Sequence, residues 1–132
     1  MTTNGKYPGL GIVDGRLAPC PNKPNCVSSQ AAASDKQHYI EALTYNGEPE
    51  QARQRLERAI AGMKRSRLVT RESNYWRAEF KSALLRFVDD VEFLFGDNEK
   101  HIDVRSASRV GYSDMGVNRK RIEEIRRWFS SG

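Results

Sequence analysis

Apolar residues recur with two different periods along residues 38–132, and these periods predict the secondary structure. Between residues 49 and 63, apolar side chains return every three or four positions with charged side chains between them. This spacing predicts an amphipathic helix of about four turns, and Pro49 suits its first turn, where the missing N–H is not needed. The same spacing returns near the C-terminus, where it predicts a second helix with one apolar face: Ile122, Ile125 and Phe129.

Alternating apolar and polar residues predict strands in the remaining part of this region. The clearest alternation covers residues 75–82, where Trp76, Ala78 and Phe80 are expected on one face. Short polar links between such stretches indicate an antiparallel meander. The predicted order β-α-β-β-β-β-α corresponds to an α+β fold in two layers, an antiparallel sheet of about five strands with both helices on one face. The predicted strands are residues 39–45, 67–72, 75–82, 87–95 and 101–107.

Residues 1–37 differ in composition from the rest of the chain. They contain four of the five prolines, both cysteines and a polar run at residues 28–36. This composition predicts an extended N-terminal arm, followed by a single α+β domain over residues 38–132. The first residues lack the charged and then apolar layout of a secretory signal, so the protein is either cytoplasmic or has lost an export signal.

Overall composition excludes several classes of protein. Hydrophobic residues make up 38% of the 132 residues and charged residues 30%, which is typical of a folded domain. No apolar run is long enough for a transmembrane helix. The net charge is +5, but residues 87–104 contain six acidic residues and one basic residue between two basic regions. We therefore expect internal neutralisation, and no nucleic-acid partner, because most aromatic residues follow the strand alternation instead of lying on an open basic surface.

The two cysteines lie in a proline-rich stretch, with Pro19 and Pro21 on either side of Cys20 and with Cys26 six positions further on. This arrangement favours a small loop closed by a disulfide, which in turn favours an exported protein. Reduced structural cysteines remain an alternative. A metal or catalytic role is a weaker interpretation, because the spacing differs from that of zinc ligands and only two histidines are present. We expect no metal and no cofactor.

The strand predicted at residues 87–95 places an acidic residue in an apolar stripe. Asp89 shares its face with Phe87, Val91 and Phe93, while Asp90 lies on the other face. A carboxylate in apolar surroundings must be paired or neutralised. Asp89 is therefore either a proton-transfer group with a raised pKa or one partner of a buried salt bridge to an arginine further along the chain.

Residues 105–121 carry the strongest indication of a binding site. A strand is expected to end near Ser106, and a helix to begin near Asn118, a good N-cap residue. The first turn of this helix then holds three basic residues, at the end where the helix dipole is already positive. Either internal carboxylates or a bound anion would offset this charge. The predicted ligand-binding residues are Arg105, Ser108, Arg109, Asn118, Arg119 and Arg121.

Residues 17–29, 87–93 and 105–121 together resemble the family catalogued as domain of unknown function 1499, and the resemblance runs from about Gly9 to Trp128. It implies a mostly bacterial type of protein that is often exported or lipid-anchored at the cell envelope, with some members in plant plastids. It therefore favours the periplasm or cell envelope, with a lipid anchor on a removed N-terminal segment. It implies no activity, cofactor or catalytic residue.

Three functions remain open on this basis. The first is a cell-envelope module that binds a small anionic ligand or a protein partner at the loop rich in arginine and serine. The second is a hydrolase or lyase in which Asp89 or Asp90 is the acid or base and Arg105 or Arg109 holds an anionic substrate. The third is a purely structural or assembly protein. Catalysis requires a carboxylate and an arginine in one open cleft, whereas the common signatures of nucleophilic, phosphate-loop and metalloprotease sites are absent.

Overall fold

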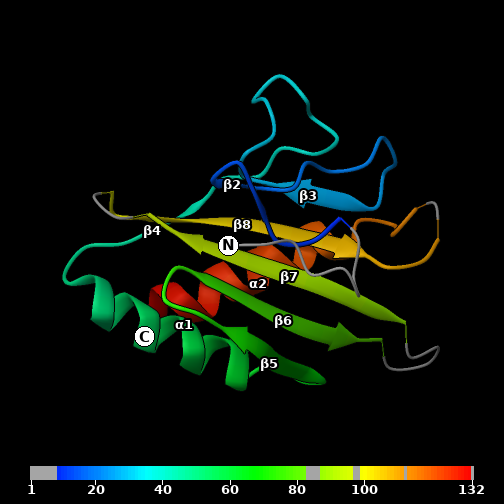
Figure 1. Cartoon of the computed structure of the whole chain (residues 1–132). Helices are drawn as coiled ribbons and strands as arrows, with labels where there is room; N and C mark the ends of the chain where they lie inside the picture. Colours follow the sequence, from blue (N-terminus) through cyan, green and yellow to red (C-terminus); the bar gives the residue numbers. More distant parts are fainter. Residues whose placement is uncertain (1–8, 83–86, 97–98, 112, 132) are drawn as a thin grey trace.

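The computed structural model describes residues 9–82, 87–96, 99–111 and 113–131. It contains two helices and eight strands in these residues (Figure 1). The helices are α1 (Pro49–Ala61) and α2 (Val117–Ser131). The strands are β1 (Ile12–Val13), β2 (Arg16–Leu17), β3 (Cys26–Ser28), β4 (Leu43–Thr44), β5 (Ser66–Arg71), β6 (Tyr75–Lys81), β7 (Val88–Phe95) and β8 (His101–Ser108).

The main sheet has the order β3-β8-β7-β6-β5, with β4 also paired to β8. All of these pairings are antiparallel. From β4 onward, the elements follow the predicted order β-α-β-β-β-β-α, and the predicted α+β class is confirmed. The sheet of meandering strands is therefore the part of the fold that local alternation specifies best.

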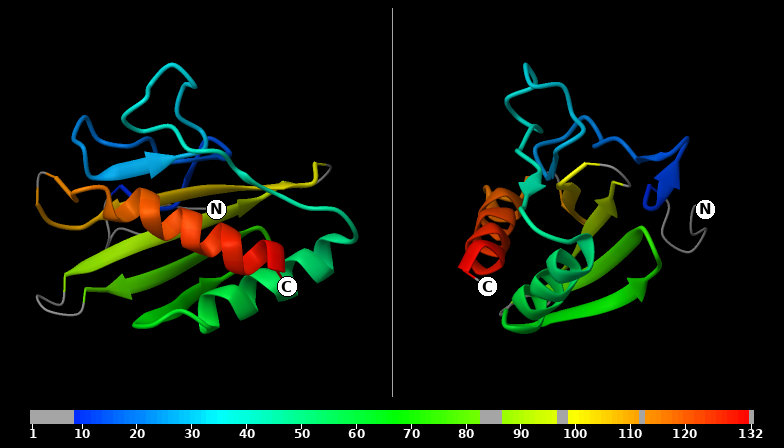
Figure 2. Two further views of the ribbon diagram at one scale, coloured as in Figure 1. Left: turned by 180° about the vertical axis from the view of Figure 1, so that it is seen from behind. Right: turned by 90° about the vertical axis from the view of Figure 1, so that its left-hand side faces the viewer.

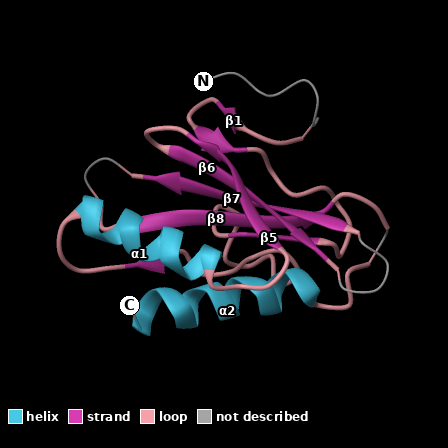
Figure 3. Cartoon of the chain, turned by 90° about the horizontal axis from the view of Figure 1, so that it is seen from below, coloured by secondary structure: helices cyan, strands magenta, loops and turns pink. Residues whose placement is uncertain are grey.

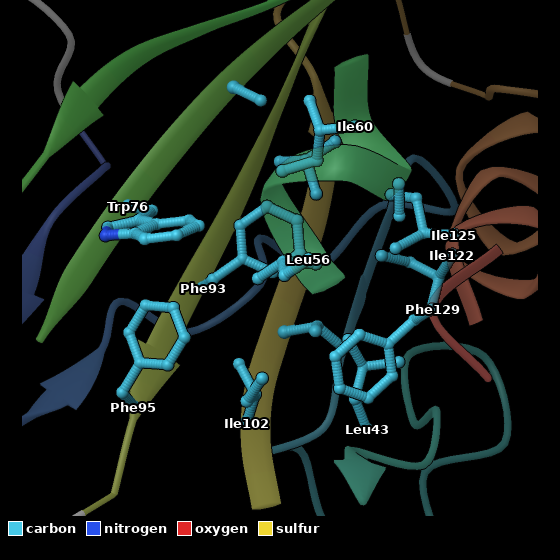
Figure 4. Packing of buried hydrophobic residues seen from close by; sticks show 14 of the residues in the cluster. Leu43, Leu56, Ile60, Trp76, Phe93, Phe95, Ile102, Ile122, Ile125 and Phe129 are labelled. Atoms are coloured by element: carbon cyan, nitrogen blue, oxygen red, sulfur yellow. The ribbon is translucent and has the colours of Figure 1, made fainter. Parts of the chain in front are cut away.

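Both helices cover one face of the sheet, as predicted (Figure 2). The alternating residues of β6 and β7 supply the sheet side of the core, where Trp76 and Phe93 are neighbours in the register. Leu56 of α1 and Ile122 of α2 are fully buried against them (Figure 4). Burial of such side chains contributes roughly 1.5–3 kcal/mol each to folding, so this layer is the main hydrophobic core.

The N-terminal region contains more regular structure than the sequence predicts. β1 and β2 form a two-stranded hairpin, and β3 joins the main sheet beside β8. These strands are two or three residues long and too short to show an alternation. The strand predicted at residues 39–45 is reduced to β4. The division of the chain at residue 37 stays a prediction, and residues 1–8 of the predicted arm and Asp97 and Asn98 of the predicted turn lie outside the described residues.

The β1–β2 hairpin lies on the side of the sheet away from the helices (Figure 3). The predicted disulfide between Cys20 and Cys26 is present. A second, small apolar cluster, in which Leu94 packs against Ile12, Leu17 and Tyr75, holds the hairpin on the sheet. The chain from residue 9 to residue 25, ahead of β3, thus forms a partial third layer, and the candidate site lies beneath it.

Replacement of Cys20 and Cys26 by serine should lower the free energy of unfolding by roughly 2 kcal/mol, because the short closed loop restricts the unfolded chain. Urea unfolding without reductant measures the difference. Reductant should lower the stability of the native protein by a similar amount and leave the double variant unchanged. Two free thiols in protein kept under oxidising conditions would contradict the disulfide.

Candidate functional site

The face of the sheet opposite the helices carries a group of buried and half-buried charged residues. They lie there because alternate residues of β6, β7 and β8 point away from the apolar core. In the register, Arg77, Glu92 and Arg105 stand in one row across the three strands. Six of these residues, three cations and three anions, are what we call the charged sheet face: Arg77, Arg105, Arg109, Glu79, Asp90 and Glu92.

Asp90 holds two arginines on this face. Its Oδ1 accepts hydrogen bonds from Nη1 of Arg77 at 2.7 Å and from Nη2 of Arg109 at 3.0 Å. Its Oδ2 accepts a hydrogen bond from Nε of Arg109 at 2.7 Å. The hydrogen bonds that Arg109 donates to Asp90 are the main cause of the raised pKa of Arg109. Burial alone would raise the pKa of Glu79, but hydrogen bonds from Arg109 and Arg77 outweigh it and lower the pKa.

Glu92 is fully buried and connects the sheet to the N-terminal region. Its Oε1 accepts a hydrogen bond from Nη1 of Arg105 at 3.0 Å. Its Oε2 accepts one from the Tyr75 hydroxyl at 2.5 Å and one from the backbone N–H of Gly11 at 2.7 Å. Burial, and then the nearby Glu92 charge, raise the pKa of Tyr75 well above its ordinary value, so Tyr75 remains a hydrogen-bond donor. Glu92 is thus a structural carboxylate whose acceptor positions are already in use.

A cavity of about 590 Å³ lies between the charged sheet face and the N-terminal region. Its sheet side includes Asp90 and Arg105, and the opposite side includes the disulfide loop. Nη2 of Arg105 donates to the carbonyl oxygen of Pro19 at 3.2 Å and so joins the two sides. The lining residues that carry polar side chains are Lys23, Asn25, Asp90, Arg105, Ser108 and Arg109.

Two of these lining residues have a buried polar atom with no hydrogen-bond partner in the described part of the chain. They are Nε of Arg105, a donor, and Oδ1 of Asn25, an acceptor. Both residues are only 3% exposed. Because an unmet hydrogen bond in a buried position costs about 1–3 kcal/mol, native proteins seldom retain one without a water, an ion or a ligand. Two residues of the cavity lining therefore carry hydrogen-bonding capacity that no described residue uses.

The six predicted ligand-binding residues do not share one site. Arg105, Ser108 and Arg109 line this cavity together with Asp90. Nη1 of Arg119 donates to the carbonyl oxygen of Tyr39 at 2.9 Å, and the other two predicted residues lie in the layer between the sheet and α2. The loop thus supplies only its strand-end residues to the cavity, while its helical residues fasten α2 to the rest of the fold.

Asn118 is not the N-cap of α2, contrary to the prediction. It lies inside the first turn, fully buried, and its Oδ1 accepts a hydrogen bond from the Ser106 hydroxyl. The capping role belongs to Asp114, whose carboxylate accepts the backbone N–H groups of Gly116 and Asn118. This carboxylate also supplies negative charge where the helix dipole is positive.

Asp89 faces the helices and forms a salt bridge with Arg121 at 2.5 Å. The sequence allowed Asp89 to be either a proton-transfer group or one partner of a salt bridge to an arginine, and the structure shows the salt bridge. The Arg121 guanidinium also lies over the Phe80 ring, 5.0 Å from its centroid. Asp89 and Asp90, adjacent in sequence, therefore act on opposite faces of the sheet, and only Asp90 lines the cavity.

Sequence reasoning missed two polar residues of the cavity, Lys23 and Asn25. Both lie in the cysteine loop, where the prolines and cysteines explain the local sequence without any binding role. The contact that brings the loop to the strand end is the hydrogen bond from the backbone N–H of Ser108 to the Asn25 carbonyl oxygen, at 3.0 Å. This contact depends on β3 pairing with β8, which no local pattern indicates.

The buried His38 also holds the cysteine loop in place. His38 Nδ1 lies 2.8 Å from Oδ2 of Asp35, and its Nε2 lies 2.9 Å from the carbonyl oxygen of Lys23. Burial alone would lower the pKa of His38, but the Asp35 and Lys23 acceptors outweigh it and raise the pKa above the ordinary value of 6.5. The hydrogen bond from His38 also lowers the pKa of Asp35 below 3.8. Only the imidazolium form donates to both acceptors.

The fold and site together define an α+β domain in which an N-terminal segment closes a charged cavity over a sheet. The sequence profile of one family matches residues 16–129, and the chain belongs to that family, described as "Protein of unknown function (DUF1499)". No curated protein matches the chain. Neither helix of the described residues is long and apolar enough to cross a membrane. Residues 9–82, 87–96, 99–111 and 113–131 contain no group of three His, Cys, Asp or Glu side chains arranged to hold a metal ion.

Replacement of Arg105 by methionine should destabilise the fold by about 3–5 kcal/mol, because it leaves the buried Glu92 carboxylate without its cation. The double variant Arg105→Met with Glu92→Gln should recover a large part of this loss, since no charge then remains unpaired. Chemical unfolding of the two single variants and the double variant gives the coupling energy. Additive losses would mean that the two side chains do not form a coupled pair.

The stabilising effect of His38 should depend on pH. Because its pKa is raised on folding, its contribution is fully present below pH 6.5 and is lost as the pH rises through the raised pKa. The contribution of Asp35 is present above pH 3.8 and is lost as the pH falls through its lowered pKa.

The Tm difference between the native protein and His38→Gln should therefore be larger near pH 5 than near pH 8.5, about one and a half to two units on either side of the ordinary pKa of histidine. Asp35→Asn removes the same ion pair and should show the same trend. A difference that stays constant across this range would show that His38 does not carry a charge in the folded protein.

Proposed function

We propose that this protein binds a small anionic ligand in the cavity between the cysteine loop and the charged sheet face. The observation that carries the proposal is that Arg105, Ser108 and Arg109 line one cavity with Lys23, and that Nε of Arg105 has no partner among the described residues. Guanidinium and ammonium groups are good donors to carboxylate and phosphate oxygens. The cavity volume of about 590 Å³ lies in the range of small-molecule sites.

The remaining predicted residues support the site from outside the cavity. Asn118 donates through Nδ2 to the Ser108 hydroxyl oxygen at 2.9 Å and so orients a lining residue. Arg119 and Arg121 are engaged with backbone carbonyls and with Asp89, respectively. We assign these three residues to positioning α2 and the strand end.

A hydrolase or lyase activity is the second candidate, because Asp90, Arg105 and Arg109 line the same cavity. A general base must have a free oxygen within reach of the substrate proton. Both carboxylate oxygens of Asp90 already accept guanidinium hydrogen bonds. Binding therefore has the better support, and Asp90 acts in this proposal by holding Arg109 in place.

We also propose that the protein acts in an oxidising compartment such as the cell envelope. The support is the Cys20–Cys26 disulfide, since disulfides persist mainly outside the reducing cytoplasm. The loop that this disulfide closes forms one side of the cavity. The proposed ligand site and the proposed oxidising location therefore depend on the same loop.

Titration with inorganic phosphate and with acetate should shift the backbone amide resonances of the cavity lining in heteronuclear NMR spectra. Lys23→Ala should weaken binding about fivefold, because it removes one cation at the exposed rim. Lys36→Ala is the matched control, since Lys36 is an exposed lysine of the same N-terminal segment that does not line the cavity. Binding that leaves the lining resonances unmoved, or that weakens equally in both variants, would show that the cavity is not an anion site.

A further inference from the structure

One end of the main sheet carries most of the large apolar side chains that the described residues expose. β6 ends, β7 begins and β8 ends there, because the three strands are antiparallel neighbours (the right-hand end in Figure 1). Four of the six large apolar residues exposed in the described part of the chain belong to links at this end, which we call the apolar sheet end: Phe87, Val110, Met115 and Val117. Phe87 directly precedes β7, and the other three lie between β8 and the first residue of α2.

The fold alone does not account for a methionine at position 115. Its φ is +56°, in the left-handed region that glycine and asparagine adopt more readily than other residues. Its side chain is 85% exposed, so it contributes little to packing within the described chain. A group of exposed apolar side chains of this kind is typical of a surface that contacts another body.

Cations lie next to these apolar residues. Lys64 and Arg65 follow α1, and the backbone N–H of Lys81, the last residue of β6, donates to the carbonyl oxygen of Arg65 at 3.0 Å. These three residues line one hollow of about 400 Å³ together with Val117. No carboxylate among the described residues forms a salt bridge with any of the three. The apolar sheet end is therefore flanked by unpaired positive charge.

The carboxylates near this end offset only part of that charge. Asp89 pairs with Arg121, and Asp114 accepts backbone N–H groups at the start of α2. Glu124 is the one acidic residue in the lining of the hollow, where it is outnumbered by the three unpaired cations. The surface thus combines exposed apolar side chains with an excess of positive charge.

We infer that the apolar sheet end docks on the surface of a bilayer that contains anionic lipids. The apolar side chains enter the headgroup region, and the flexible lysine side chains reach the lipid phosphates around them. Charge complementarity alone also fits an acidic protein. Two of the three cations are lysines, however, which protein interfaces disfavour and anionic lipids attract as well as arginine. The hollow shares no lining residue with the anion cavity, so this inference does not rest on the proposed function.

Cosedimentation with vesicles measures this docking. The native protein should bind vesicles made of equal parts of phosphatidylglycerol and phosphatidylcholine much more tightly than vesicles of phosphatidylcholine alone. Lys64→Ala and Lys81→Ala should each weaken binding to the anionic vesicles about fivefold, because each basic residue contributes separately at an anionic surface. Lys36→Ala is the matched control and should bind like the native protein, since Lys36 is an exposed lysine in the link between β3 and β4.

Met115→Asn separates docking from folding. Asparagine suits the positive φ at this position, so the variant should keep or raise the Tm. It should nevertheless bind the anionic vesicles about tenfold more weakly, because it lacks the most exposed apolar side chain of the surface. Val13→Thr is the control for loss of apolar surface elsewhere, since Val13 is an exposed residue of the β1–β2 hairpin, and its binding should not change.

Three results would overturn the inference. The first is equal binding of the native protein to both kinds of vesicle, or to neither. The second is an affinity that falls as much in Lys36→Ala or Val13→Thr as in the variants of the apolar sheet end. The third is weaker binding of the lysine variants with unchanged binding of Met115→Asn, because charge alone would then attract the protein and an acidic protein partner would be the better explanation. None of these results affects the anion titration of the cavity.

Discussion

The buried Glu92 carboxylate is the interaction on which the N-terminal layer depends. It is fully excluded from water, and its partners come from three parts of the chain: Arg105 of β8, Tyr75 of β6 and the backbone of Gly11. A buried carboxylate is tolerated only when such partners meet its hydrogen-bonding capacity. Because one of them is a backbone N–H of the N-terminal segment, the charge can be buried only when that segment lies on the sheet. The cavity exists only in this closed arrangement.

The charge pattern of the sequence has a direct counterpart in three dimensions. The acidic residues of β7 lie between β6 and β8, and the basic residues of those two strands face them across the register. Internal neutralisation, expected from the acidic region between two basic ones, therefore occurs within the sheet. This explains why a chain with net charge +5 has its arginines largely engaged on this face and does not present them as an open basic surface.

Local patterns predicted the helices and the meander because each of these elements carries its own period. Pro49 and the apolar residues after it specify α1 without reference to the rest of the chain. The β3 strand carries no such signal, because it has three residues and its pairing partner lies about eighty positions away. The same difference separates the residues of the candidate site that could be predicted from those that could not. Arg105 and Arg109 could be selected from their positions at a strand end, whereas Lys23 and Asn25 become lining residues only through the pairing of β3 with β8.

The prediction for residues 118–121 shows a further limit of reasoning from local sequence. The excess of positive charge at the start of α2 was a sound reason to expect negative groups nearby. It could not show which groups these are. Asp114 caps the helix and Asp89 pairs with Arg121 from the sheet, so the local excess is met without a ligand. The unpartnered Nε of Arg105 lies instead on the other face of the sheet.

The cysteine loop is held at several points, and this rigidity bears on how selective the cavity can be. The disulfide closes the loop, His38 binds the carbonyl oxygen of Lys23, and Ser108 binds that of Asn25. A loop fixed in this way loses little further freedom when a ligand enters, so more of each new contact appears as affinity. A site of this kind distinguishes ligands by the donors and acceptors they bring, because its own groups are fixed before the ligand arrives.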